Sequence, residues 1–303
     1  METRRLNGET LICLKNRALE ISIAPGVGGR ITSVRSAGDG YEFLWTNGAL
    51  PLERLEPGSE YDPNFYGGID ELLPNDMPEY VNGIHEPDHG ELWTRALDWR
   101  MDGEALTMET VLPRCGLEYR KTVSLAEDAP EIVLRYRVSN PTCEARDFLW
   151  KMHAALRIAP GDEIVCPAAK AVSADPEWSR VSADAPFEWP NAFGMRADRV
   201  PERDGSTEFL YLYNLQSGEI GWQRSAENRS FVYRFDPNVF PYCWYFASYG
   251  GFFGHYTAVL EPCSAMPISI SEAAAKGACS RLAPGECIET TVTIHVGEIE
   301  NDE

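Results

Sequence analysis

Glu261 is the carboxylate of this 303-residue sequence whose neighbours best suit it to acid–base chemistry. It follows four nearly apolar residues in the run Tyr256-Thr-Ala-Val-Leu-Glu-Pro-Cys263 and precedes a proline. A carboxyl group in such surroundings is expected to be shielded from water, and burial raises the pKa of a carboxyl group toward the range of a general base at neutral pH. The alternative is a structural residue at the end of a strand, paired with a neighbouring cation.

His153 lies in a segment that has two chemically different faces. If the segment 148–157 is a strand, one face carries Phe148, Trp150, Met152, Ala154 and Leu156. The other face carries Leu149, Lys151, His153, Ala155 and Arg157. This pattern predicts that one face packs into a core while the other presents His153, either as a proton donor or as an ordinary polar side chain of an outer face.

His85 and His89 are four residues apart in His85-Glu-Pro-Asp-His-Gly-Glu-Leu-Trp93. This spacing is typical of a metal-binding helix, but Pro87 and Gly90 predict a turn instead. A metal would also need a third ligand, for which nearby carboxylates are available at Asp88, Glu86 and Glu91. We favour a second interpretation, in which His89 is held at the start of a strand and Gly90 allows a ligand to approach closely.

The elements that must position these residues are predicted to be β-strands. Apolar and polar residues alternate in five further segments: Leu19–Ile23, Leu117–Leu125, Ile132–Val138, Phe231–Phe235 and Val292–Val296. A single helix of about two turns is expected at Ser271–Gly277, ending at the glycine. The segment 162–204 is rich in Pro, Asp, Ser and Trp and predicts a long irregular insertion. We therefore expect an all-β fold, a large antiparallel β-sandwich with little helix that forms one domain over residues 1–303.

The composition argues against several classes of function. Lys and Arg number 27 against 47 Asp and Glu, and the resulting charge of −20 disfavours binding to nucleic acid or to an anionic membrane. No run reaches the roughly 18 apolar residues of a membrane helix, and no signal peptide is recognisable. Eight cysteines without a Cys-x-x-Cys pair predict reduced, mostly buried thiols and a cytoplasmic protein. A monomer or a homodimer is expected.

Four short motifs, in this order along the chain, resemble the galactose mutarotase-like superfamily, which contains the aldose 1-epimerases. They are Ala24-Pro-Gly-Val-Gly-Gly-Arg-Ile-Thr-Ser-Val34, Gly67-Gly-Ile-Asp-Glu-Leu-Leu-Pro74, Asp88-His-Gly-Glu-Leu-Trp93, and the strand of His153 followed by Val259-Leu-Glu-Pro-Cys263. The resemblance implies a β-sandwich whose concave sheet binds a small carbohydrate. It also implies that His89 contacts the sugar, that His153 is the general acid and that Glu261 is the general base. Two such groups catalyse anomer exchange without a metal or another cofactor.

The sequence departs from the family where a substrate-binding arginine is expected. The segment 66–75 has no such arginine, and Asp70 and Glu71 stand there instead. Trp93 and Arg95 are expected to help fill the cleft, since aromatic rings stack on sugars and charged groups bind hydroxyls. The predicted substrate contacts are therefore His89, Asp88, Arg95, Trp93, Asp70 and Glu71.

Three functions are compatible with these residues. The first is an aldose 1-epimerase (mutarotase), an isomerase of carbohydrate metabolism. The second is a carbohydrate-binding protein of the same fold without catalysis, because a fold does not fix a function. The third is a metal-dependent sugar isomerase that uses His85, His89 and carboxylates. A neutral sugar is expected rather than a sugar phosphate, because acidic residues outnumber the few cations near the motifs, which are Arg30, Arg95, Lys151 and Arg157.

Overall fold

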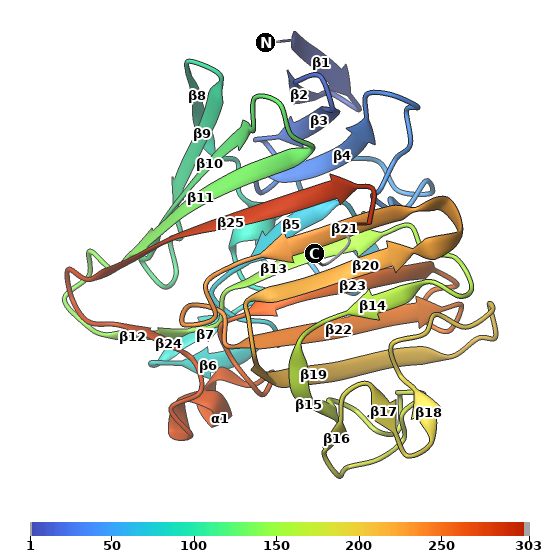
Figure 1. Cartoon of the computed structure of the whole chain (residues 1–303). Coiled ribbons are helices and arrows are strands. Elements are labelled where there is room, and N and C mark those ends of the chain that lie inside the picture. Colours follow the sequence, from blue (N-terminus) through green and yellow to red (C-terminus); the bar gives the residue numbers. More distant parts are fainter. Residues whose placement is uncertain (1, 300–303) are drawn as a thin grey trace.

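The computed structural model describes residues 2–299, which form two large β-sheets that face each other (Figure 1). The first sheet has eleven strands, in the spatial order β1 (Glu2–Leu6), β2 (Glu9–Lys15), β3 (Leu19–Ala24), β4 (Arg30–Ser36), β5 (Ile69–Leu72), β13 (Lys151–Leu156), β23 (Tyr256–Cys263), β22 (Tyr242–Tyr249), β19 (Thr207–Leu215), β15 (Ala168–Ser173) and β16 (Phe187–Glu188). The second has eight, in the order β14 (Glu163–Val165), β20 (Glu219–Arg224), β21 (Arg229–Arg234), β25 (Cys287–Gly297), β11 (Glu131–Ser139), β10 (Glu118–Leu125), β9 (Ala105–Val111) and β8 (Asp98–Asp102).

Short elements lie around the two sheets. Three two-stranded pairs are β12 (Arg146–Phe148) with β24 (Ser280–Leu282), β17 (Asn191–Ala192) with β18 (Met195–Arg196), and β6 (Glu79–Val81) with β7 (Ile84–Glu86). Single 3₁₀ turns span Asp62–Asn64, Leu92–Thr94 and Ser225–Glu227. The helix α1 (Ile270–Ala275) lies beside β6 and β12 (Figure 1).

The fold confirms the predicted all-β sandwich with little helix. The five alternating segments fall in β3, β10, β11, β21 and β25, and the run that ends with Glu261 is β23. The expected helix also forms: the side chain of Ser269 caps its first turn by accepting a hydrogen bond from the Glu272 amide. Gly277, just beyond it, has a φ of +64°, a conformation that glycine adopts at little cost.

The prediction of an irregular insertion over 162–204 was wrong for its first part. β14 pairs with β20 in the second sheet, and β15 pairs with β19 in the first. β14 has only three residues, and β15 reads Ala168-Ala-Lys-Ala-Val-Ser173, whose small side chains give a weak alternation signal. The remainder of the segment contributes β16, β17 and β18, each two residues long, and the loops between them.

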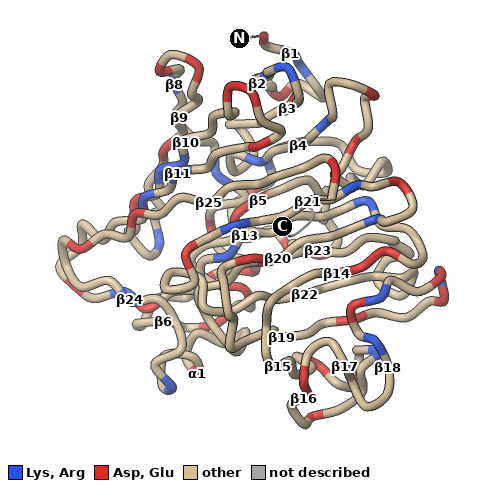
Figure 2. The backbone as a smooth tube through the Cα atoms, in the orientation of Figure 1, with Lys and Arg blue, Asp and Glu red and all other residues tan. Residues whose placement is uncertain are grey.

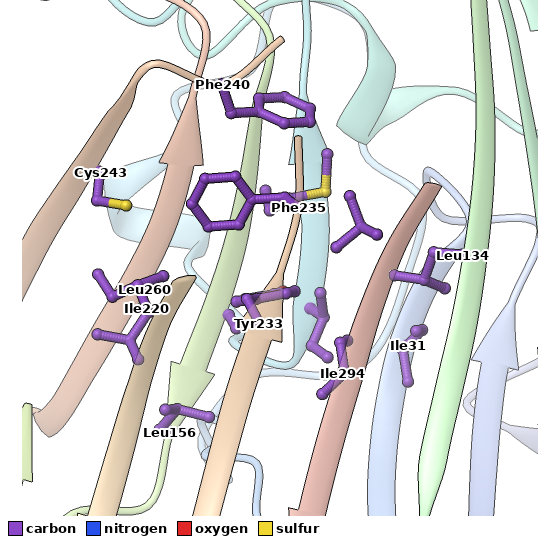
Figure 3. Close-up of a cluster of buried hydrophobic side chains, with 14 of the residues drawn as sticks. Ile31, Leu134, Leu156, Ile220, Tyr233, Phe235, Phe240, Cys243, Leu260 and Ile294 are labelled. Atoms are coloured by element: carbon purple, nitrogen blue, oxygen red, sulfur yellow. The ribbon is translucent and has the colours of Figure 1, made fainter. Parts of the chain in front are cut away.

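The core lies between the sheets. In Figure 3, Leu156 and Leu260 of the first sheet lie with Ile220 and Ile294 of the second in one cluster of buried side chains. Such burial of apolar surface is the main force that stabilises a two-layer fold. The sheet residues that alternate with these point away from the core, and there they are free to take other roles.

β13 shows how this alternation separates core residues from candidate functional residues. Met152 and Ala154 belong to the cluster between the sheets. Lys151, His153 and Ala155 alternate with them and face the other way, yet all are buried, because loop residues cover the outer face of the strand. The two-faced strand predicted around His153 is therefore confirmed.

The distribution of charged residues along the chain and the state of the cysteines can be compared with what the composition predicted. Lys and Arg are scattered among Asp and Glu along the chain rather than gathered in one basic stretch (Figure 2). No helix among residues 2–299 is long and apolar enough to cross a membrane. The eight cysteines are all free, but only four of them are buried, fewer than expected: Cys13, Cys115, Cys243 and Cys263.

Candidate active site

His153 and Glu261 lie side by side on the outer face of the first sheet. In the pairing of β5 with β13, Asp70 is the direct neighbour of His153. The register of β13 with β23, in which Ala154 pairs with Leu260, puts His153 across from Glu261. Directly opposed residues of neighbouring strands share one face of a sheet and have their Cβ atoms about 4.5–5.5 Å apart. The sheet thus brings together two groups that are 108 residues apart in the sequence.

A cavity of about 270 Å³ opens over this part of the sheet. Its titratable lining residues are Asp62, Asp76, His89, Lys151, His153, Asp175 and Glu261. Its aromatic lining residues are Tyr61, Phe65, Trp178, Phe209, Phe246 and Phe252. Ligand pockets combine such an apolar wall with a few convergent polar groups, and this one is slightly smaller than their usual range of about 300–1,000 Å³. The three residues that the motifs singled out therefore share one cavity of a size that suits a single sugar ring.

Asp70 holds His153 from behind. Asp70 Oδ1 lies 3.2 Å from His153 Nδ1. Asp70 Oδ2 accepts a hydrogen bond of 2.9 Å from the Tyr61 hydroxyl and forms an ion pair of 2.7 Å with Arg30. Burial alone would raise the pKa of Asp70, but the charge of Arg30 and the contact with His153 lower it to about 2. An ionised carboxylate only accepts hydrogen bonds. Nδ1 of His153 therefore carries the hydrogen, and Nε2 is the nitrogen left for a ligand.

Lys151 and Asp76 hold Glu261. Glu261 Oε2 lies 2.6 Å from Lys151 Nζ, and the same ammonium group also contacts Asp76. Its nitrogen lies 4.5 Å from the centre of the Trp244 ring, within the range of a cation–π interaction. Burial by itself would lower the pKa of Lys151, but the two carboxylates raise it above its usual value. Lys151 is therefore charged, and it neutralises part of the negative charge in the floor of the cavity.

His89 is fixed in the cavity wall by a turn. It has a φ of +55°, and its ring stacks on Tyr61 with centroids 4.2 Å apart and planes 10° from parallel. Nδ1 lies 2.8 Å from Asp88 Oδ1, and Nε2 lies 3.9 Å from Asp76 Oδ1. Burial would lower the pKa of His89, but Asp76 and Asp88 raise it above its usual value.

Gly90 is required here for a different reason from the one predicted. A side chain at this position would collide with the backbone of Leu73 and Pro74, and the φ of Gly90 is +76°. The close approach is therefore made by the neighbouring backbone rather than by a ligand. It lets the amide groups of Glu91 and Leu92 donate to the carbonyl of Leu73, which ties the turn to the end of β5.

Glu71 does not face the cavity, because it follows Asp70 on β5 and adjacent strand residues point to opposite faces. It lies in the interior between the sheets, where it accepts hydrogen bonds of 2.6 Å from Lys121 Nζ and from the Tyr136 hydroxyl. This position corrects the prediction that Glu71 contacts a sugar. Asp70 is also absent from the cavity lining, so its contact is with His153 rather than with a ligand.

The other predicted contacts support the site or lie outside it. Asp88 accepts a 2.7 Å hydrogen bond from the amide of Tyr61 and holds His89, and Trp93 Nε1 donates to the Asp88 carbonyl. Neither lines the cavity. Arg95 lies in a separate groove beside β8 and β9, so the prediction that it fills the same cleft is corrected.

Sequence reasoning missed Asp76 and the aromatic wall. Asp76 lies four residues beyond the end of β5, where no alternation indicates which side chains turn inward. Tyr61 and Trp178 come from irregular segments, where no periodicity indicates which side chains turn inward. Lys151 could have been found, because it shares a strand face with His153.

The ligand set of the metal-dependent alternative is not assembled. His85 is exposed on β7, where its ring packs edge-on against Tyr80. Among residues 2–299, three or more metal-binding side chains come together in one group only, which consists of Glu86, Glu91 and Cys115. That group includes neither histidine, and none of its members lines the cavity.

Comparison with known proteins gives matches in three-dimensional structure. No protein-family model matches the sequence, and a search of curated proteins finds no match. The chain superimposes on the Slr1438 protein of Synechocystis sp. PCC 6803 with a TM-score of 0.73, over 99% of this chain and 98% of that one, at 14% identity. A galactose mutarotase-like protein from Clostridium acetobutylicum gives a TM-score of 0.73 over 98% of both chains at 13% identity.

A galactose mutarotase-like protein from Lactobacillus casei ATCC 334 matches with a TM-score of 0.68, over 95% of this chain and all of that one, at 15% identity. Likeness at these identities establishes architecture and leaves activity to be argued from the site. The chain thus has the galactose mutarotase-like fold that its sequence motifs predicted.

Proposed function

We propose that this protein interconverts the two anomers of a free sugar, with Glu261 as general base and His153 as general acid. The observation that carries the proposal is the pairing of these two groups across neighbouring strands, inside one cavity lined by aromatic rings. The structural neighbours described as mutarotase-like support the same reaction class. Each positioned acid or base contributes about 10²- to 10⁴-fold to a rate, which is enough for a reaction that needs only proton transfer.

The reaction balances with these two groups. Glu261 takes the proton of the anomeric hydroxyl, and protonated His153 gives its Nε2 proton to the ring oxygen. The bond between C1 and the ring oxygen then breaks and leaves an open-chain aldehyde. After rotation about the C1–C2 bond, the hydroxyl attacks the other face of the aldehyde, and the two proton transfers run backwards. Asp70 supports the acid because its negative charge lies beside the imidazolium ring.

The substrate class that the cavity suits is a neutral monosaccharide. Lys151 is the one lysine or arginine among the lining residues of the described chain, and both of its charged partners are already in place. Asp62 and Asp175 add negative charge to the lining. The rings of Trp178 and Phe246, stacked with centroids 5.2 Å apart, offer an apolar wall for the hydrophobic face of a sugar ring.

The test is an anomer-exchange assay on a panel of free aldoses. Each pure anomer is dissolved with the protein, and the approach to equilibrium is followed by polarimetry or by proton NMR. We expect at least one aldose to equilibrate much faster than in buffer, and Glu261→Gln to abolish the acceleration. Binding of several aldoses without acceleration of any would instead favour the non-catalytic carbohydrate-binding protein, for which the aromatic wall is the specific supporting observation.

A further inference from the structure

Lys151 is the residue of the cavity whose surroundings call for an explanation beyond the two proton transfers. Its side chain is 3% exposed and lies between the carboxylates of Asp76 and Glu261, which are themselves buried. A buried ammonium group is costly unless it is paired. Lys151 also sits two residues before His153 on the same face of β13, so the acid and this cation are positioned by one strand.

The contacts of Lys151 leave it little freedom. Its nitrogen is within ion-pair distance of the carboxylates of both Asp76 and Glu261. The ring of Trp244 packs against the same nitrogen at 4.5 Å, from the strand next to that of Glu261. The lysine is therefore unavailable as a separate ligand for a substrate, and its position is tied to that of Glu261.

We propose that Lys151 is the positioning residue of the base: it keeps Glu261 ionised and aimed into the cavity, and Asp76 holds Lys151 for that task. The role of Glu261 as a base rests on the proposed function. The effect of Lys151 on the charge of Glu261 rests on the contacts alone. A cavity lined with aromatic rings disfavours an isolated carboxylate, and the ion pair with Lys151 reverses that preference.

Asp76 prevents the cation from holding Glu261 too strongly. One ammonium group between two carboxylates leaves one net negative charge, so Lys151 is shared and does not act on Glu261 alone. Once Glu261 has accepted the proton of the substrate, Lys151 and Asp76 remain as a neutral pair, and no unpaired charge is left in the floor of the cavity. The same carboxylate lies 3.9 Å from His89, so Asp76 also links the base to the predicted sugar-binding residue.

The other titratable groups around Lys151 leave this balance unchanged. Tyr211 and Cys263, which come from β19 and β23, have pKa values raised by burial and are neutral at physiological pH. His153 is engaged by Asp70 on its far side, and His89 is held by Asp88. Lys151 is thus the cation in ion-pair contact with Glu261, and Asp76 is the carboxylate that shares it.

The proposal gives opposite expectations for two variants. Lys151→Met removes the cation, so Glu261 should hold its proton to a higher pH, by about one pH unit or more. Asp76→Asn removes the competing carboxylate, so the full charge of Lys151 acts on Glu261, which should release its proton at a lower pH. Lys151→Arg keeps the charge and should stay close to the wild type.

The measurement is the titration of the Glu261 side-chain carboxyl carbon by NMR in protein labelled with ¹³C-glutamate. Its signal is assigned by its loss in Glu261→Gln. Because this readout needs no substrate, it decides the proposal even if no sugar is turned over, which would count against the proposed function alone. Where activity is found, the acid limb of the pH profile of kcat/KM should move with the titration in each variant.

Two results would overturn the proposal. One is an unchanged Glu261 titration in Lys151→Met, and the other is a shift of the same sign in Lys151→Met and Asp76→Asn. If Lys151→Met fails to fold, the downward shift in Asp76→Asn decides alone. Circular dichroism on each variant separates loss of fold from loss of positioning.

Discussion

Buried carboxylates occur in two regions that are close in sequence and opposite in electrostatic character. Behind His153, just outside the cavity lining, the pKa of Asp70 is lowered to about 2 despite burial, which alone would raise it, because Arg30 and His153 lie against the carboxylate. Beside the turn that carries His89, Glu86 is also buried, and there burial and the charge of Glu91 raise the pKa of Glu86 to about 8.

The difference between the regions is the presence of a cation in contact. Arg30 is within ion-pair distance of Asp70, and Lys151 is within ion-pair distance of Glu261. No ion pair to Glu86 is formed within residues 2–299. Burial raises the pKa of a carboxyl group unless a cation or hydrogen-bond donors offset it. Asp70 and Glu86 thus share burial but have opposite pKa shifts, and of the two only Asp70 contacts a residue of the cavity, His153.

The largest effect expected from the difference between the two regions is on catalysis. We expect Glu261→Gln to lower anomer exchange by about 10²- to 10⁴-fold while sugar affinity changes little, because an amide keeps the shape of the carboxylate but cannot act as the base. The matched control is Glu86→Gln, the same substitution in a buried carboxyl group outside the cavity, which should exchange anomers at the wild-type rate. Equal rates in wild type and Glu261→Gln would remove Glu261 from the mechanism.

The second effect is on stability. Asp70→Asn leaves Arg30 buried without its anion, and breaking a buried ion pair costs about 3–5 kcal/mol. Urea denaturation should reveal this loss. The control Asp39→Asn breaks an exposed ion pair with Arg229 and should change the midpoint little. Exchange should fall as well, because His153 Nδ1 loses its charged acceptor. A midpoint in Asp70→Asn equal to that of the control would mean that Arg30 is compensated in another way.

The fold was predictable because its signals are local. Alternation along a strand determines which residues share a face, so the strands of His153 and Glu261 and the two faces of β13 could be read from the sequence. The same rule should have prevented the assignment of both Asp70 and Glu71 to one ligand, since adjacent residues of β5 cannot share a face. Because the motif Gly67–Pro74 was interpreted as one unit, the opposite directions of Asp70 and Glu71 were overlooked.

The rest of the site depends on contacts between segments far apart in the chain. Arg30 reaches Asp70 across a strand pair, and Tyr61 reaches it from a loop. Trp178 enters the cavity from a segment that was expected to be irregular. Nothing in the spacing of these residues specifies their meeting, because loop paths follow the packing of the whole molecule. The strand pattern therefore located His153 and Glu261, and a motif located His89 on its turn, whereas Tyr61 and Trp178 on loops were missed.

The third prediction concerns Glu86, whose proton links stability to pH. The folded protein holds this proton up to about pH 8, whereas the unfolded chain releases it near the ordinary value for Glu, about 4.3. The stability that it contributes is complete below the unfolded value and is lost as pH rises toward 8, by at most about 1.4 kcal/mol per pH unit. Glu86→Gln carries no such proton, so its Tm should rise relative to that of the wild type as the pH increases from 5 to 8.

The control for Glu86 is its neighbour. Glu91 accepts hydrogen bonds of 3.0–3.1 Å from the amides of Arg114 and Cys115, so Glu91→Gln should lose stability at every pH tested. A difference in Tm between Glu86→Gln and wild type that stays constant from pH 5 to pH 8 would contradict the protonated state. It would also remove the contrast between this cluster and the cavity.

The smallest effect tests whether Lys151, the lysine that lines the cavity, and Arg30 behind His153 stay paired with their carboxylates when a ligand binds. Phosphate binding requires free Arg or Lys side chains, or the N-terminus of a helix, but Lys151 already contacts Asp76 and Glu261, and Arg30 contacts Asp70. We therefore expect glucose and galactose to bind at least as tightly as their 6-phosphates in competition measurements. Phosphates that bind tenfold tighter or more, a difference of about 1.4 kcal/mol, would mean that a cation leaves its carboxylate when the ligand enters. Lys151→Met would then identify it, since the preference for the phosphate should disappear in that variant.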